Sequence, residues 1–194
     1  MEKRSFEQDM KIESSTLINE LIELTTQHIA LAQQLQHYSP DELNKRPYEG
    51  SWSTLECIEH LNRYADFYLP EIEQRIKSSS APSRKIFKSG LLGNYFANMM
   101  LPKSKLNKIK TFKQMDPIGS QLTADVIRTF ILQQQRLIHI LNTSRDADLQ
   151  KIKTSISISR WIKIRLGDTF SILIYHNERH MQQIRRIFTT TDLS

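Results

Sequence analysis

The chain has 194 residues and a formal net charge of +6, and it contains five glycines, six prolines and one cysteine. This length fits one domain over residues 1–194, the low glycine and proline content disfavours a turn-rich β-sandwich or barrel, and the lone cysteine excludes a disulfide framework or a multi-cysteine zinc site. No apolar run approaches the roughly 20 residues of a membrane helix, and the first residues lack the apolar core of a signal peptide, so we expect a cytoplasmic protein with no membrane partner.

Two amphipathic helices are predicted in the first half of the chain. The first covers roughly residues 14–37, where leucines and one histidine recur at steps of three and four and so share one helical stripe. The second covers roughly residues 53–77 and starts with the Ser-x-x-Glu spacing of a capping box. Pro70 lies inside this second helix and cannot donate a backbone hydrogen bond, so we expect a kink or break between Asp66 and Pro70.

Two further amphipathic helices are predicted at roughly residues 120–142 and 168–189. In the last one the apolar residues point inward, and Arg179, Gln182 and Arg186 fall on the opposite side by helical phase. Four such helices predict an all-α fold, namely a four-helix bundle with a long connection between helices two and three.

The segments between these helices carry weaker signals. About 40 residues separate helices two and three, which exceeds an ordinary connection, so this segment either crosses the bundle or holds a short helix near GLLGNYFANMM, residues 90–100. Ahead of the last helix, residues 151–159 alternate isoleucine or threonine with polar residues, which predicts an extended arm or one isolated strand.

Three of the six histidines are predicted to point into the bundle. His176 and His180 are one helical turn apart on the apolar face of the last helix, so their imidazoles can meet at one point, as a divalent metal ion requires. His60 lies at the edge of the apolar arc of the second helix. Together the three would form a three-nitrogen site with open positions, and the alternative is a set of core histidines with hydrogen-bond partners.

The remaining candidates for metal binding are weaker. Cys57, which lies nearly one turn before His60, could complete a mixed site as a thiolate, but we interpret it as a small buried residue. His37 lies at the end of the first helix and His139 lies off the apolar stripe of the third, so both are predicted at the surface.

Two motifs in the chain resemble the DinB/YfiT-like superfamily. WSTLECIEHL has the family's W-S-x-x-E-x-x-x-H-L helix start, and HNERHMQQ has its H-x-x-x-H-x-x-Q helix. Members of this family are four-helix bundles, and the resemblance implies three metal ligands at His60, His176 and His180. It further implies a divalent metal ion, zinc or nickel, as the cofactor. Residues 87–117 are similar to the longer connection of one branch of the family.

The same resemblance implies a metal-dependent hydrolase or a thiol S-transferase of the bacillithiol type. The substrate would be a small molecule, in the second case a low-molecular-weight thiol, and the metal would lower the pKa of the attacking water or thiol. Both reactions need a general acid or base, yet no Asp or Glu is predicted to point inward, because Glu56 points away from the apolar arc and serves as the cap partner. The catalytic residues stay unknown.

Four polar residues are predicted near the centre in other roles. His28 on the first helix and Gln134 on the third lie on inner stripes, where they either line a cavity or serve as hydrogen-bonded core groups. Gln183, three residues after His180, and the inward Asn177 are predicted to hold the ligands in place by hydrogen bonding.

The positive charge is concentrated in residues 84–114, which hold eight basic and no acidic side chains, interleaved with aromatic residues. We interpret this segment as a solvated connection around a short hydrophobic helix, and nucleic-acid binding is not expected because no DNA-binding motif is present. The alternative function is a non-enzymatic binding protein with a structural metal, in which segment 84–114 contacts an anionic partner. The sequence leaves open whether the protein forms a homodimer.

Overall fold

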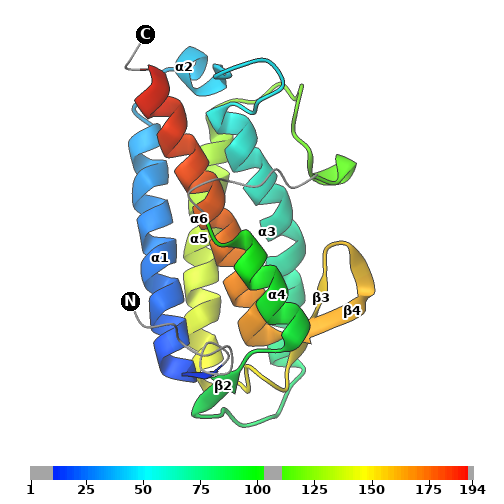
Figure 1. The fold of residues 1–194 in the computed structure, drawn as a ribbon. Coiled ribbons are helices and arrows are strands. Elements are labelled where there is room, and N and C mark those ends of the chain that lie inside the picture. Colours follow the sequence, from blue (N-terminus) through cyan, green and yellow to red (C-terminus); the bar gives the residue numbers. More distant parts are fainter. Residues whose placement is uncertain (1–10, 103–110, 192–194) are drawn as a thin grey trace, which may run out of the picture.

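The computed structural model describes residues 11–102 and 111–191, and four long helices lie side by side in it as a bundle (Figure 1). These helices are α1 (Ser14–Leu35), α3 (Thr54–Lys77), α5 (Asp125–Thr143) and α6 (Leu166–Thr191). They confirm the four predicted helices to within one or two turns at their ends. The short helix α2 (Pro40–Asn44) precedes α3. None of the described helices is long and apolar enough to cross a membrane.

Helices that follow each other in the chain are not always neighbours in the bundle. Helix α1 packs against α5 and α6, and α3 packs against the same two helices. Helices α1 and α3 therefore lie on opposite sides of the bundle (Figure 1). As a result α3 and α6, which carry the three metal-candidate histidines, are direct neighbours.

The core consists of two apolar clusters, one toward each end of the bundle. Residues of all four helices form each cluster, with Phe170 in one and Phe130 in the other. Between the clusters, buried polar side chains interrupt the apolar packing, and we call them the polar layer. A buried polar group destabilises a fold unless it finds a partner, so this layer needs hydrogen bonds or ligands. Its members are Thr25, His28, His60, Asn62, Gln134, His176, Asn177 and His180.

The connection between α3 and α5 contains ordered elements in its described part. These are β2 (Ile86–Lys88), α4 (Leu91–Met100) and the 3₁₀ turn η1 (Lys113–Met115). Strand β2 pairs antiparallel with β1 (Lys11–Glu13), a pairing that the sequence did not predict, whereas α4 is the short helix expected near residues 90–100. Helix α4 packs across α6, with Gly93 so close to Asp168 that a Cβ atom would lie 2.2 Å from the carboxyl carbon.

After α5 and the 3₁₀ turn η2 (Ser144–Asp146), two strands precede α6. Strands β3 (Lys153–Ile156) and β4 (Ser159–Arg165) form an antiparallel hairpin that extends from the bundle beside α3 (Figure 1). The prediction of a single extended arm or isolated strand is therefore wrong. A second strand is needed because each strand supplies hydrogen-bond partners for the backbone of the other.

Helix α3 continues through Pro70, so the predicted break is absent. Pro70 itself is exposed, while Leu69 and Ile72 are buried in the core. Burial of two such side chains stabilises the helix by about 3–6 kcal/mol. This gain offsets the cost of about 3 kcal/mol for a proline inside a helix.

Candidate metal centre

The beginning of α3 is held in place just before His60. The Ser53 hydroxyl accepts a hydrogen bond from the Glu56 N–H, and the Glu56 carboxylate accepts one from the Ser53 N–H, which confirms the predicted capping box. The same carboxylate accepts hydrogen bonds from Arg46 Nε at 3.0 Å and from the Gly119 N–H at 3.2 Å. Glu56 is thus the cap partner, but the flanking loops also bury it, which its helical phase did not indicate.

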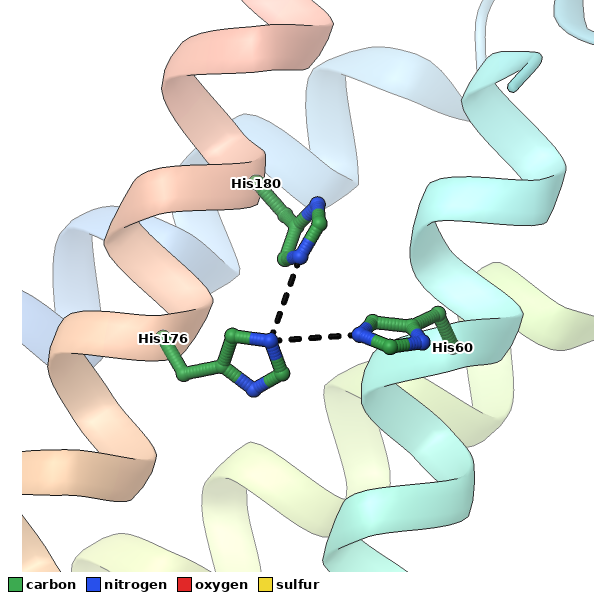
Figure 2. A group of neighbouring side chains, drawn as sticks. All are labelled: His60, His176 and His180. Atoms are coloured by element: carbon green, nitrogen blue, oxygen red, sulfur yellow. Dashed lines mark hydrogen bonds between the residues drawn. The ribbon is translucent and has the colours of Figure 1, made fainter. Parts of the chain in front are cut away.

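His60 on α3 and His176 and His180 on α6 point toward one another across the interface of the two helices (Figure 2). The Nε2 atom of His176 lies 3.1 Å from Nε2 of His60 and 3.2 Å from Nε2 of His180. The three ligand atoms all lie within 4.8 Å of one another. Nitrogens bound to one tetrahedral zinc ion at about 2.0–2.1 Å would be roughly 3.3–3.4 Å apart. The cluster therefore needs only small adjustments to hold such an ion.

The outer nitrogens of two imidazoles determine where the protons lie. His60 Nδ1 is 2.7 Å from the Met115 carbonyl oxygen, and His180 Nδ1 is 3.0 Å from Gln183 Oε1. Because both oxygens accept, both Nδ1 atoms donate, and Nε2 of each ring carries a lone pair. Only His176 can hold a proton at the centre of the cluster. Two lone pairs at least thus face one point, which is the donor set of a cation site.

Burial keeps these imidazoles neutral. It lowers the pKa of His60 to about 4, although the Met115 carbonyl and the nearby Asp116 act in the opposite direction. Burial lowers the pKa of His180 to about 3, and burial together with the neighbouring histidines lowers the pKa of His176 well below its ordinary value. Neutral imidazole is the form that binds a metal ion, so near pH 7 the cluster is in its metal-binding form.

Two aromatic side chains flank the three histidines. The Trp52 ring lies 4.6 Å from the His60 ring and stacks on the His180 ring at 5.7 Å between centroids. Tyr64 meets His60 and His176 edge-on, at 5.0 Å and 4.8 Å. Burial raises the pKa of Tyr64 to about 12, so its hydroxyl stays protonated near neutral pH. These rings exclude water from two sides of the cluster and limit how the imidazoles can turn.

A carboxylate enters the polar layer at a place that the sequence did not indicate. His28 Nε2 lies 2.9 Å from Glu178 Oε2, and His28 is fully buried. The expectation that no Asp or Glu points inward is therefore wrong for Glu178. This residue lies between His176 and His180 in sequence, but it turns toward α1, whereas the two histidines turn toward α3. His28 is thus a core group with a hydrogen-bond partner.

The other polar residues of the layer also have partners. Asn177 Nδ2 donates to Gln134 Oε1 at 2.9 Å, so these two side chains pair across the bundle between α6 and α5. Gln183 contacts His180, at the place where a residue that orients a ligand is expected. Gln134 and Asn177 are thus hydrogen-bonded to each other, and the roles expected for them and for Gln183 stay predictions.

Arg179 is an exception among the residues expected on the outer face of α6, because only 8% of it is exposed. The helical period places Arg179 opposite the apolar stripe, but it does not show which segments cover that side of the helix. Cys57 is fully buried in an apolar cluster and lies outside the group of potential ligands. His37 and His139 are exposed, as predicted.

The DinB superfamily matches residues 23–184 of the chain. The chain belongs to the DinB superfamily. Over 99% of its length it also resembles 92% of the solved structure of YfiT from Bacillus subtilis, with a TM-score of 0.57 and 13% sequence identity. YfiT is described as a probable metal-dependent hydrolase with an unusual four-helix bundle topology. At this identity the likeness shows a shared fold. No curated protein matches the chain significantly.

Part of the basic segment of this DinB-superfamily protein has partners within the fold. Arg84 Nε lies 2.6 Å from the Asp148 carboxylate, and Lys85 pairs with Glu13 at 3.5 Å. Four further lysines of the segment lie outside the described residues, so the interpretation of segment 84–114 as a solvated connection stays a prediction there. They are Lys103, Lys105, Lys108 and Lys110.

Proposed function

We propose that this DinB-superfamily protein binds a divalent metal ion, zinc or nickel, through His60, His176 and His180 and catalyses hydrolysis of a small molecule. The convergence of three Nε2 atoms, at 3.1 Å and 3.2 Å from the central one, supports this proposal most directly. Two of these nitrogens carry lone pairs and no proton donor satisfies both, so the donor set fits a cation.

Three protein ligands leave coordination positions for water or substrate, which is typical of catalytic rather than structural zinc. When bound, the ion would act as a Lewis acid that lowers the pKa of water or of a thiol. The chain's own groups orient the ligands: the Met115 carbonyl holds His60 in one tautomer, and Gln183 does the same for His180. Trp52 and Tyr64 exclude bulk water from the cluster, which strengthens electrostatic interactions inside it.

A thiol S-transferase of the bacillithiol type is the second candidate, and one observation favours it. Among the residues that the structure describes, no carboxylate forms a hydrogen bond with any of the three imidazoles. Both water and a thiol must lose a proton before they attack, but a thiol has a pKa of about 8.5 against about 15.7 for water, so it depends less on a general base beside it. A low-molecular-weight thiol would then be one substrate and an electrophile the other.

The first test measures metal binding. We expect purified protein to contain close to one zinc or nickel ion per chain, and Co²⁺ to give the visible absorption of a tetrahedral or five-coordinate site with nitrogen ligands. The variant His60→Ala loses this spectrum, and the control Cys57→Ala keeps it. Retention in His60→Ala together with loss in Cys57→Ala would show that the ligand assignment is wrong.

The second test separates the functions. Metal-loaded protein is assayed with 4-nitrophenyl acetate for hydrolysis, and with cysteine plus monochlorobimane for thiol transfer. Hydrolysis that requires His60 supports the first proposal, and thiol conjugation that requires His60 supports the second. A closed shell of four protein ligands in the metal-bound protein, with neither activity, would support a structural metal in a non-enzymatic binding protein.

A further inference from the structure

A groove lies between α3 and the β3–β4 hairpin, and none of the three clustered histidines lines it. It has a volume of about 500 Å³, which is within the range of small-molecule sites. Figure 1 shows that the hairpin stands beside α3, and residues of both elements line the groove. Ser155, Arg160 and Lys163 line it from the hairpin, and Phe67, Pro70 and Glu71 line it from α3.

The α3 wall offers an apolar surface and an unused acceptor. Phe67 is half-buried and packs against the core, so it is held in place, and Pro70 lies next to it on the groove side. Because proline has no N–H, the Asp66 carbonyl lacks the hydrogen bond that it would otherwise accept within the helix. A ligand with an apolar body and a polar donor would therefore find complementary groups on this wall.

The acidic side chains of the groove are already engaged. Glu71 accepts hydrogen bonds from Arg75 Nε and from the Ser155 N–H, each at 2.9 Å. These two contacts, which outweigh the effect of partial burial, lower the pKa of Glu71. Asp66 accepts a hydrogen bond from Gln133 of α5 at 2.8 Å. Both carboxylates line the groove, but these hydrogen bonds join them to residues other than Arg160 and Lys163.

The two cations of β4 lack such partners. Within the described part of the chain, neither the Arg160 guanidinium nor the Lys163 ammonium forms a hydrogen bond or an ion pair. Both line the groove, so an anion placed there would meet two positive charges, one of which can bind a carboxylate with two parallel hydrogen bonds.

The groove lies on the same face of α3 as the metal centre. His60, Tyr64, Phe67 and Glu71 follow one another at steps of four, three and four, which places them on one stripe of the helix. The axial distance from His60 to Phe67 is roughly 10 Å at 1.5 Å per residue. Tyr68, whose ring is 6.4 Å from that of Tyr64 and 5.0 Å from that of Phe67, continues the aromatic surface between the two places.

We propose that the groove binds the carboxylate-bearing end of a small molecule with an apolar body, whose reacting group lies at the three histidines. Arg160 and Lys163 bind the carboxylate, and Phe67 and Pro70 contact the apolar body. The placement of the reacting group rests on the proposed function, whereas binding of the anionic end in the groove does not.

Binding is tested with 3-phenylpropanoate and its neutral amide, 3-phenylpropanamide, by saturation-transfer NMR and equilibrium dialysis on the full chain. We expect the acid to bind wild-type protein at least about tenfold more tightly than the amide, and added salt to weaken only the acid. The double variant Arg160→Gln, Lys163→Gln loses this preference. The matched control Lys151→Gln, Lys153→Gln, which removes two exposed lysines near the same hairpin, keeps it.

Equal affinity for acid and amide in the wild-type protein, or an unchanged preference in the Arg160→Gln, Lys163→Gln variant, would overturn the proposal. The variant His60→Ala separates this result from the proposed function, because the preference for the acid should persist there even if the metal is lost. With metal-loaded enzyme, the ratio of kcat/KM for the 4-nitrophenyl monoester of octanedioic acid to that for 4-nitrophenyl acetate should fall about tenfold in the double variant. If neither ester is hydrolysed, the proposed hydrolase function is wrong. The binding measurements with the acid and the amide still test whether the groove binds a carboxylate.

Discussion

The polar layer contains two kinds of buried histidine, and the difference lies in their partners. His28 Nε2 lies 2.9 Å from a carboxylate oxygen of Glu178, so this nitrogen is satisfied within the protein, whereas Nδ1 of the same ring is buried with no hydrogen-bond partner among the described residues. The three clustered histidines instead face one another, and within the described part of the chain their other hydrogen-bond partners are the neutral oxygens of Met115 and Gln183. The first arrangement pairs one imidazole nitrogen with a carboxylate, whereas the second directs at least two nitrogen lone pairs at one point.

Both arrangements come from one turn of α6. His176 and His180 face α3, and Glu178 between them faces α1, so the same stretch of helix holds a metal-candidate cluster on one side and a buried histidine–carboxylate contact on the other. Burial alone therefore does not show what a histidine does. The chemistry of the group on the neighbouring helix decides whether it is structural or able to bind a ligand.

The sharpest test of this comparison removes one histidine of each kind. His176→Ala should weaken Co²⁺ binding by more than about a hundredfold, since even residues that only orient ligands contribute 10- to 100-fold. His28→Ala should leave Co²⁺ binding intact but lower the free energy of unfolding by about 2–4 kcal/mol, because it creates a cavity and removes the contact that Glu178 Oε2 makes with His28. Metal titration and urea denaturation of both variants measure the two effects. Loss of metal binding in His28→Ala would show that His28 is not purely structural and would contradict this comparison.

The free energy of unfolding of the metal-free protein should depend on pH, because burial disfavours protonation of the clustered histidines. The unfolded chain takes up a proton at His60 near pH 6.5, but the folded chain does so only near pH 4, because burial disfavours the charged ring. Stability is therefore lost as the pH falls from 6.5 to 4, by about 3 kcal/mol for His60 alone. His180, with its pKa of about 3, acts in the same direction.

The measurement is urea denaturation of the chelator-treated protein at a series of pH values. His60→Gln should flatten the pH dependence between pH 6.5 and 4, and His37→Gln controls for the loss of an exposed histidine. A free energy of unfolding that rises as the pH falls would contradict the burial of neutral imidazoles.

Two glutamines of the bundle should behave differently although both bond within it. Gln183→Ala should weaken metal binding about tenfold, because His180 loses the acceptor that fixes its tautomer. Gln134→Ala should leave metal affinity unchanged and destabilise the fold by about 1–3 kcal/mol, because it leaves the Asn177 amide buried without a partner. Isothermal titration with Zn²⁺ and thermal unfolding separate the two outcomes, and equal effects on metal binding would show that the whole layer acts as one unit.

The smallest effect is expected in the basic segment. Changing Lys103, Lys105, Lys108 and Lys110 together to glutamine should leave the Co²⁺ spectrum intact and cost less than about 1 kcal/mol, because exposed charges contribute little. Circular dichroism and urea denaturation measure this. Salt-sensitive binding of duplex DNA by the wild-type protein that disappears in the variant would instead favour the anionic-partner alternative.

Helix positions and inward faces were predictable because they depend on local periodicity. The apolar residues of α1, α3, α5 and α6 recur with the helical repeat, and the capping box of Ser53 and Glu56 marks where α3 begins. The convergence of His60 with His176 and His180 was also predicted, from the i, i+4 spacing of the last two and from the resemblance of the motifs to a known family.

Contacts between distant segments were not predictable in the same way. Glu178 meets His28 only because α1 and α6 are neighbours, and the helical phase of Arg179 does not reveal that this residue is buried. For the β3–β4 hairpin, the sequence indicated one extended segment but not the second strand that pairs with it. A strand depends on its partner as much as on its own pattern.

The sequence by itself determined the four amphipathic helices and the face of each helix on which the histidines lie, because the 3.6-residue period is a local property of the chain. Only the tertiary structure decided which helices are neighbours, that the Met115 carbonyl sets the proton position of His60, and that the hairpin forms a groove with α3. These features depend on packing between residues far apart in sequence. Their energies are set by burial and hydrogen-bond geometry, which no local pattern records.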